Sequence, residues 1–137
     1  QAQSDIPLNR LDVALARPLD PDNFSDNILQ IGQITGTANP TLGMRVAKSG
    51  RTTGYTEGMI SQINATVDVS YNTPAGIRTA RFTGQMLASA MSQGGDSGSL
   101  IVQQGTSSAV GLLFAGSSRA TIFTPINVVL DELNLTF

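Results

Sequence analysis

The chain has 137 residues and a formal net charge of −2, because eight Lys and Arg side chains stand against ten Asp and Glu. Only 13% of the residues are charged, about half the ~25% of an ordinary soluble domain. This mildly acidic composition lacks the basic field that binds nucleic acids and anionic membrane surfaces, so we expect neither as a partner. No apolar run approaches the roughly 18 residues of a membrane-spanning helix, and one domain is the default at this length.

Two residue types are missing altogether. Without cysteine the chain has no disulfide and no thiolate nucleophile, and without histidine it lacks the commonest general base and metal ligand. We therefore expect no metal and no cofactor, and a hydrolytic mechanism would need its base from another side chain or another polypeptide. The chain begins at Gln1 with no methionine or signal peptide, which indicates a processed or excised segment.

Frequent glycine, threonine and valine indicate strands joined by turns. The irregular spacing of Ile60 and Ile63 predicts a bulge or bend, and a turn is predicted at Asn72–Gly76. The predicted strands are residues 11–16, 28–36, 43–50, 59–71, 77–84, 99–105 and 109–116, with a turn-rich connector at 18–27.

The end of the chain has a helical period instead. Ile126, Val129, Leu130 and Leu133 recur at helical spacing, and we expect Thr124 to cap this helix with Pro125 as its first residue. Six or seven short strands and one C-terminal helix indicate a closed barrel or a sandwich.

The sequence QGGDSGSL, residues 93–100, is the most informative motif. Glycines on both sides of Ser97 permit a tight turn and a close approach of substrate. In such a turn the N–H groups of Gly95 and Ser97 can point into one concavity and stabilise an oxyanion, which is worth roughly 3–4 kcal/mol per donor. The alternative is an ordinary flexible loop, because Gly, Asp and Ser are common turn residues.

Five segments, in order along the chain, resemble the chymotrypsin-like serine peptidases, especially the bacterial α-lytic protease and streptogrisin group. KSGRTTGYTEGMI (48–60) is similar to a strand–turn–strand segment with an SGRTTG core, and GGDSGS (94–99) to the nucleophile loop. AVGLLFAGSS (109–118) is similar to the substrate-lining strand, and TIFTPINVVLDEL (121–133) to the closing strand and helix. DVALARP (12–18) resembles the strand that presents the triad aspartate.

This resemblance implies an all-β fold, the second six-stranded antiparallel barrel of a two-barrel enzyme, with a C-terminal α-helix. Residues 1–27 would be a remnant strand of the first barrel and the connector, and residues 28–137 the C-terminal barrel. Ser97 would be the acyl-forming nucleophile, Gly95 and Ser97 N–H groups the oxyanion hole, and Asp12 the residue that orients the imidazole. A chance GDSGS in an unrelated β-barrel remains the alternative.

The histidine of the family precedes its aspartate by tens of residues, whereas only eleven residues precede Asp12 here. Loss of a triad member leaves about 10³–10⁴-fold catalysis over water, so the chain alone should be nearly inactive. We interpret it as the C-terminal part of a serine endopeptidase that is nicked, with its histidine-bearing fragment bound, or as a remnant of that enzyme. The alternative is a silent homologue that acts as a binding or regulatory module.

The missing first barrel also predicts an uncovered apolar surface. Such a surface promotes association, so we expect either the N-terminal fragment that carries the histidine or a second copy of the chain as a partner. The other expected partner is a polypeptide substrate.

The resemblance places Met91, Phe114, Ala115 and Gly116 along the substrate. None is acidic, which predicts an apolar primary pocket without a counter-ion for Arg or Lys; the alternative is that Met91 and Phe114 are ordinary core residues. The backbone of Gly116 would pair with an extended substrate.

Lys48 precedes the SGRTTG-like turn, where the bacterial relatives have a basic partner for the aspartate of the nucleophile loop. A buried carboxylate is costly unless it is paired, so we expect an ion pair between Lys48 and Asp96. The alternative is a solvated surface lysine.

Overall fold

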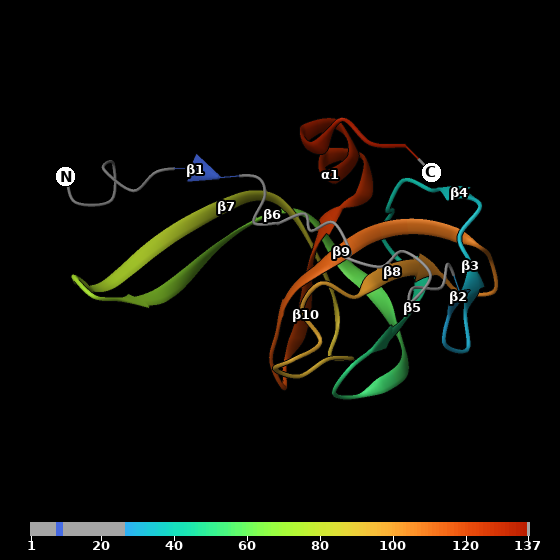
Figure 1. The fold of residues 1–137 in the computed structure, drawn as a ribbon, viewed down its shortest axis with the longest axis horizontal. Coiled ribbons are helices and arrows are strands. Elements are labelled where there is room, and N and C mark those ends of the chain that lie inside the picture. Colours follow the sequence, from blue (N-terminus) through green and yellow to red (C-terminus); the bar gives the residue numbers. More distant parts are fainter. Residues whose placement is uncertain (1–7, 10–26, 137) are drawn as a thin grey trace, which may run out of the picture.

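The computed structural model describes residues 8–9 and 27–136 (Figure 1). It is mainly strands with a short C-terminal helix, which confirms the predicted all-β class. The elements are β1 (Leu8–Asn9), β2 (Asn27–Ile28), β3 (Gly32–Gln33), β4 (Gly36–Thr37), β5 (Arg45–Gly50), β6 (Gly54–Thr73), β7 (Gly76–Ser89), β8 (Leu100–Gln103), β9 (Ser108–Gly116), β10 (Ala120–Pro125) and α1 (Ile126–Leu133). The strand predicted at 11–16 lies outside the described residues.

Among the described strands, β5 to β10 form a closed ring in which every neighbouring pair is antiparallel (Figure 1). The order around the ring is β5, β6, β7, β10, β9, β8 and back to β5. β4 pairs in parallel with β9, and β1 with β7. Closure satisfies the strand edges that an open sheet would leave free.

In place of the single strand predicted over 28–36, the structure has three two-residue strands, β2, β3 and β4, the last of which begins at Gly36. Gln30 and Gly32 have positive φ angles of 65° and 95°. Two residues with positive φ so close together reverse the direction of the chain, so residues 29–31 form a turn between β2 and β3.

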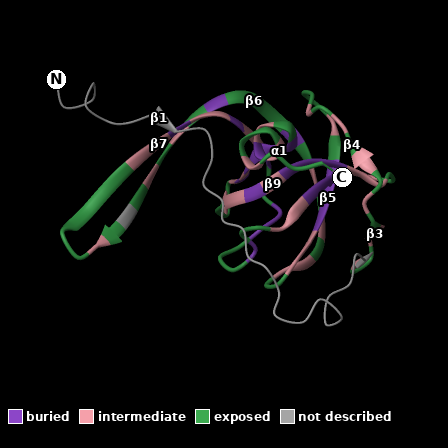
Figure 2. Ribbon diagram, turned by 45° about the horizontal axis from the view of Figure 1, so that its top comes forward, coloured by how far each residue is buried: buried purple, intermediate pink, exposed green. Residues whose placement is uncertain are grey.

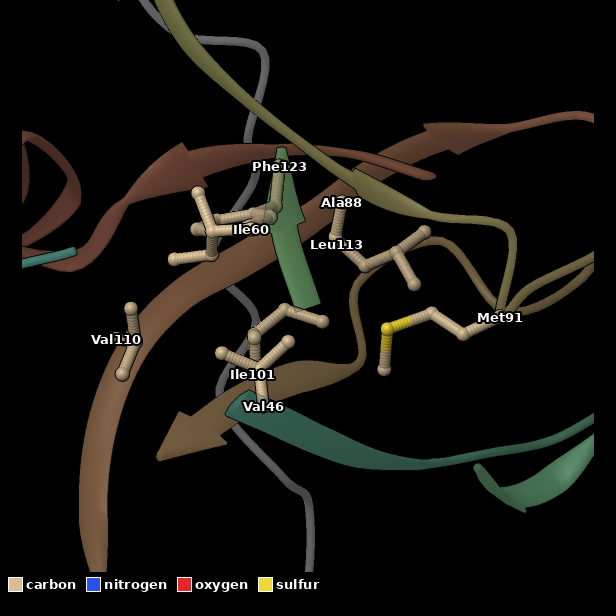
Figure 3. Close-up of a cluster of buried hydrophobic side chains, with 8 residues drawn as sticks. All are labelled: Val46, Ile60, Ala88, Met91, Ile101, Val110, Leu113 and Phe123. Atoms are coloured by element: carbon tan, nitrogen blue, oxygen red, sulfur yellow. The ribbon is translucent and has the colours of Figure 1, made fainter. Parts of the chain in front are cut away.

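The core fills the inside of the ring (Figure 3). Its buried residues are Val46, Ile60, Ala88, Met91, Ile101, Val110, Leu113 and Phe123. They come from β5 to β10 and from the segment after β7, so burial of this cluster holds all six ring strands together. Helix α1 buries Ile126 and Val129 and contacts β9 and β10.

Strands β6 and β7 continue beyond the ring as a long hairpin whose outer part is largely exposed (Figures 1 and 2). Their register shifts three times between Ile60 and Val67, which confirms the irregularity predicted near Ile60 and Ile63. Extra residues in one strand increase its twist and bend. The hairpin turns between Thr73 and Gly76, as predicted, and Asp68 pairs with Arg81 across it at 2.8 Å.

The predicted start of the C-terminal helix is wrong at both residues, because Thr124 does not cap it and Ile126, not Pro125, is its first residue. Pro125 is the N-cap, no side chain caps the helix, and Thr124 still belongs to β10, where it pairs with Leu112. The buried Thr124 hydroxyl donates to Gln85 Oε1 at 2.8 Å. Sheet pairing and this buried partner therefore outweigh the local capping preference.

Gly111 on β9 is required by close packing. A Cβ atom there would lie 2.6 Å from the Thr124 carbonyl oxygen and 2.8 Å from Phe123 Cε1. We expect Gly111→Ala to lower the free energy of unfolding by about 1–3 kcal/mol, because overpacking forces neighbours apart. Gly36→Ala is the control, since nothing lies within 4 Å of its Cβ position, and urea denaturation of both variants makes the comparison. Equal stability of the two would contradict this packing.

Candidate active site

Residues 93–99, named the serine loop here, connect the end of the β7 segment to β8 and are folded into two consecutive tight turns. The Asp96 N–H donates to the Gln93 carbonyl at 3.1 Å and the Ser99 N–H to the Asp96 carbonyl at 3.0 Å. Gly95 and Gly98 have φ angles of +99° and +88°, which only glycine adopts without strain. Gly95 and Gly98 are therefore required by the backbone.

Strand β9 holds one side of the serine loop. The Gly98 N–H donates to the Leu113 carbonyl at 2.8 Å, and the Leu113 N–H donates to the Ser99 carbonyl at 2.8 Å. The exposed Ser97 hydroxyl donates to the Phe114 carbonyl at 3.2 Å. Within the described part of the chain, the N–H groups of Gly95 and Ser97 have no acceptor. Two free N–H donors beside a hydroxyl are what stabilisation of an oxyanion requires.

The Asp96 carboxylate holds the other side of the loop. It is fully buried, and its Oδ1 accepts the N–H groups of Thr52 at 2.8 Å and Thr53 at 3.1 Å. Its Oδ2 accepts the Gln93 N–H at 2.9 Å and the Thr53 hydroxyl at 2.7 Å. Burial alone would raise the pKa of Asp96, but these four hydrogen bonds outweigh it and hold that pKa well below its usual range.

Lys48 lies beneath the same carboxylate, also fully buried, with Nζ 3.8 Å from Asp96 Oδ2. Its ammonium donates to the Gly54 carbonyl at 2.9 Å and to the Thr53 hydroxyl, which itself donates to Asp96. Burial lowers the pKa of Lys48, and the charge of Asp96 offsets part of this effect. The structure brings together the two residues that the sequence paired. The sequence did not predict the hydroxyl of Thr53 that bridges them.

The predicted pocket residues are divided between the core and the surface. Met91 is only 5% exposed and its side chain belongs to the core cluster (Figure 3). The Phe114 ring packs against Phe82, with centroids 4.6 Å apart. Ala115 is half-buried opposite Ile122 of β10.

Gly116 lies against the buried Ser92, because a Cβ atom at Gly116 would come within 3.2 Å of Ser92 Cβ. The Ser92 hydroxyl shares a 2.8 Å hydrogen bond with the Thr121 hydroxyl. Beside this contact is a hollow of about 410 Å³. It is lined by Thr53, Thr56, Ala90, Met91, Ser92, Gln93, Ser117 and Ser118. Six of these eight residues carry a hydroxyl or amide group, which the sequence had not indicated, but more of the exposed lining is apolar than polar.

Asp12 lies outside the described residues, so its role as the triad aspartate stays a prediction. In the described ranges, no group of three or more acidic side chains is arranged to hold a metal ion. The part of the chain that the structure describes contains no helix with the length and apolar character needed to cross a membrane.

We expect Lys48→Met to destabilise the chain by about 3–5 kcal/mol, because it leaves a buried carboxylate without its cation. Hydrogen exchange at the hydrogen-bonded N–H groups of Gln93 and Asp96 should accelerate as the serine loop loosens. Arg45→Met, an exposed position on the same strand, should change stability by less than about 0.5 kcal/mol. Urea denaturation and amide exchange measure both effects, and a Lys48→Met variant as stable as Arg45→Met would refute the role of the pair.

Solved bacterial proteases have the same fold. Cellulomonas bogoriensis chymotrypsin is 27% identical with a TM-score of 0.61, and the match covers 77% of this chain and 55% of that one. Thermobifida fusca protease A is 30% identical with a TM-score of 0.60, covering 81% and 60%. Nocardiopsis protease is 27% identical with a TM-score of 0.61, covering 76% and 53%. The chain thus spans little more than half the length of these proteins.

These likenesses confirm the chymotrypsin-like fold that the sequence predicted. No curated protein matches the chain. The model of peptidase family S64 matches residues 7–136, nearly the whole sequence. The chain therefore belongs to peptidase family S64 and has the fold of the chymotrypsin-like serine peptidases.

Proposed function

We propose that this chain carries the nucleophile and the oxyanion donors of a serine endopeptidase that cleaves polypeptides through an acyl-enzyme. One observation carries the proposal: the exposed Ser97 hydroxyl lies on a loop that also presents the free N–H groups of Gly95 and Ser97. The buried Asp96 fixes that loop, so the donors are held in place before substrate arrives. Preorganised donors of this kind give the largest single contribution to acyl transfer.

The reaction follows from these groups. Ser97 Oγ attacks the carbonyl carbon of the scissile bond while a base takes its proton, and the carbonyl oxygen becomes an oxyanion bound by the two N–H groups. The intermediate collapses with cleavage of the C–N bond, and the protonated base gives its proton to the departing amine. Water then attacks the Ser97 ester with the same base, which releases the acid and restores the hydroxyl.

The base must come from outside this sequence, which contains no histidine. The Ser97 hydroxyl donates to the Phe114 carbonyl, and a backbone carbonyl cannot accept its proton at neutral pH. The solved relatives extend well beyond the matched region, which supports a parent protein with a further segment. We place the catalytic histidine on that segment and Asp12 beside it, with residues 1–27 as the connection to the first barrel and residues 28–137 as the C-terminal barrel.

The substrate would run as an extended chain along the end of β9, and the backbone of Gly116 would pair with it. Gly116 is exposed at the end of that strand. Hydroxyl and amide side chains line part of the adjoining hollow, but more of its exposed lining is apolar than polar. This supports the apolar primary subsite that the sequence predicted.

The test is reconstitution. The chain is combined with the segment of its parent protein that carries the histidine, and peptide hydrolysis is measured together with labelling of Ser97 by a fluorophosphonate, read by peptide mass. Ser97→Ala should abolish labelling and lower kcat by about 10⁴–10⁶-fold. Ser70→Ala, at an exposed position on the β6–β7 hairpin, should leave both unchanged.

Hydrolysis that persists in Ser97→Ala would exclude Ser97 as the nucleophile. A reconstituted complex that neither cleaves peptides nor takes up the label would instead favour a silent binding module. Sedimentation of the chain alone distinguishes the two expected partners. A monomer favours the histidine-bearing segment, and a dimer favours a second copy of the chain.

A further inference from the structure

Arg51 lies directly beside the oxyanion donors. A Cβ atom at Gly95 would come within 2.6 Å of Arg51 Nη2 and 3.3 Å of Nε, and it would overlap Thr52 Oγ1. The missing side chain of Gly95 therefore leaves the space that the guanidinium occupies. The Gly95 N–H is one of the two free donors of the serine loop, so a full positive charge adjoins the proposed oxyanion site.

The backbone around Arg51 is fixed on both sides. The Thr52 N–H donates to Asp96 at 2.8 Å, and its hydroxyl donates to the Gly94 carbonyl at 2.9 Å. On the other side, a Cβ atom at Gly50 would lie 2.9 Å from both Asp96 Cγ and Ser99 Oγ. The side chain of Arg51 is exposed, but its Cα atom has little freedom to move. A guanidinium on such a support loses less entropy when it binds a planar anion.

Arg51 also has no acidic partner within the described part of the chain. Asp96 is the acidic residue of the adjoining loop, and its oxygens are occupied by four hydrogen bonds and the charge of Lys48. The positive charge of Arg51 is therefore available to a molecule that approaches the serine loop.

Two elements contact the serine loop from opposite sides, and they define the direction in which a bound substrate crosses it. Strand β9 contacts the loop through Ser97 and Gly98, whereas the turn at 51–53 contacts it through Gly94, Gly95 and Asp96. A substrate whose acyl part pairs with β9 reaches Ser97 from that side. The residues after the scissile bond then leave across the oxyanion donors toward Arg51.

We propose that Arg51 is a specificity-determining residue that binds a carboxylate on the leaving-group side of the scissile bond. This inference rests on the proposed peptidase function. The carboxylate is an Asp or Glu side chain in the first two residues after that bond, or the free C-terminus of a short leaving peptide, since both present two oxygens to the fork of the guanidinium. The pairing selects among substrates and takes no part in the bond-making steps.

The test uses the reconstituted enzyme and peptides that are identical up to the scissile bond. One pair of C-terminally amidated peptides carries Asp or Asn after the bond, and a second pair carries Asn with a free or an amidated C-terminus. We expect kcat/KM to be about fivefold higher for the charged member of at least one pair, as for an exposed ion pair. The pair that shows the preference identifies the source of the carboxylate. Arg51→Gln should bring that ratio close to one, Arg51→Lys should keep part of it, and 1 M NaCl should reduce it.

Arg45→Gln is the matched control and should keep the full preference, because Arg45 is an exposed arginine on β5. An ester substrate without residues beyond the scissile bond separates failure of the Arg51 inference from failure of the proposed function. Ester hydrolysis that Ser97→Ala abolishes, together with equal rates for both peptide pairs or a preference unchanged in Arg51→Gln, would overturn the inference and leave the proposed function standing. Failure to cleave the ester as well would overturn both.

Discussion

The site depends on the buried carboxylate of Asp96 more than on any other group. Burying a carboxylate is costly unless hydrogen bonds and a cation compensate for the lost water. Four hydrogen bonds and the ammonium of Lys48 supply that compensation. They come from two segments, residues 48–53 and 93–96, so the carboxylate fixes the serine loop against the turn that precedes β6.

The ring of strands gives these segments their positions. β5 has Val46 in the core and Lys48 two residues further on, so both side chains point to the inside of the ring. β9 holds the other side of the serine loop and presents the edge along which a substrate would lie. In the proposed function, the ring supplies the nucleophile, the oxyanion donors and a binding edge. The same proposal takes the proton acceptor from another part of the protein, so the chain alone should be a poor catalyst.

Much of this could be predicted from the sequence because the signals are local. The hydrophobic pattern predicted strands between residues 43 and 116, and the resemblance added the closing strand. The GGDSGS motif predicted the serine loop, and the resemblance paired Lys48 with Asp96. The bridge through Thr53 could not be predicted, since one hydroxyl among many is selected only by tertiary packing. Tertiary packing also determines the contact between Arg51 and Gly95. It likewise keeps Thr124 in the sheet as part of β10, although its sequence context favours a helix cap. Asp12 lies outside the described residues and remains a prediction from the resemblance.

The most direct measurement is the pKa of Asp96, obtained by following its carboxyl carbon by NMR as the pH is lowered. Because hydrogen bonds favour the ionised form, the folded-state pKa is depressed below the ~3.9 of an unfolded chain. Ionisation of Asp96 therefore stabilises the fold fully above about pH 4, and this contribution is lost as the pH falls toward the folded pKa. The account predicts that Asp96 stays ionised well below pH 3.9 for as long as the chain remains folded. A midpoint at or above about 3.9 would mean that this carboxylate does not hold the site together.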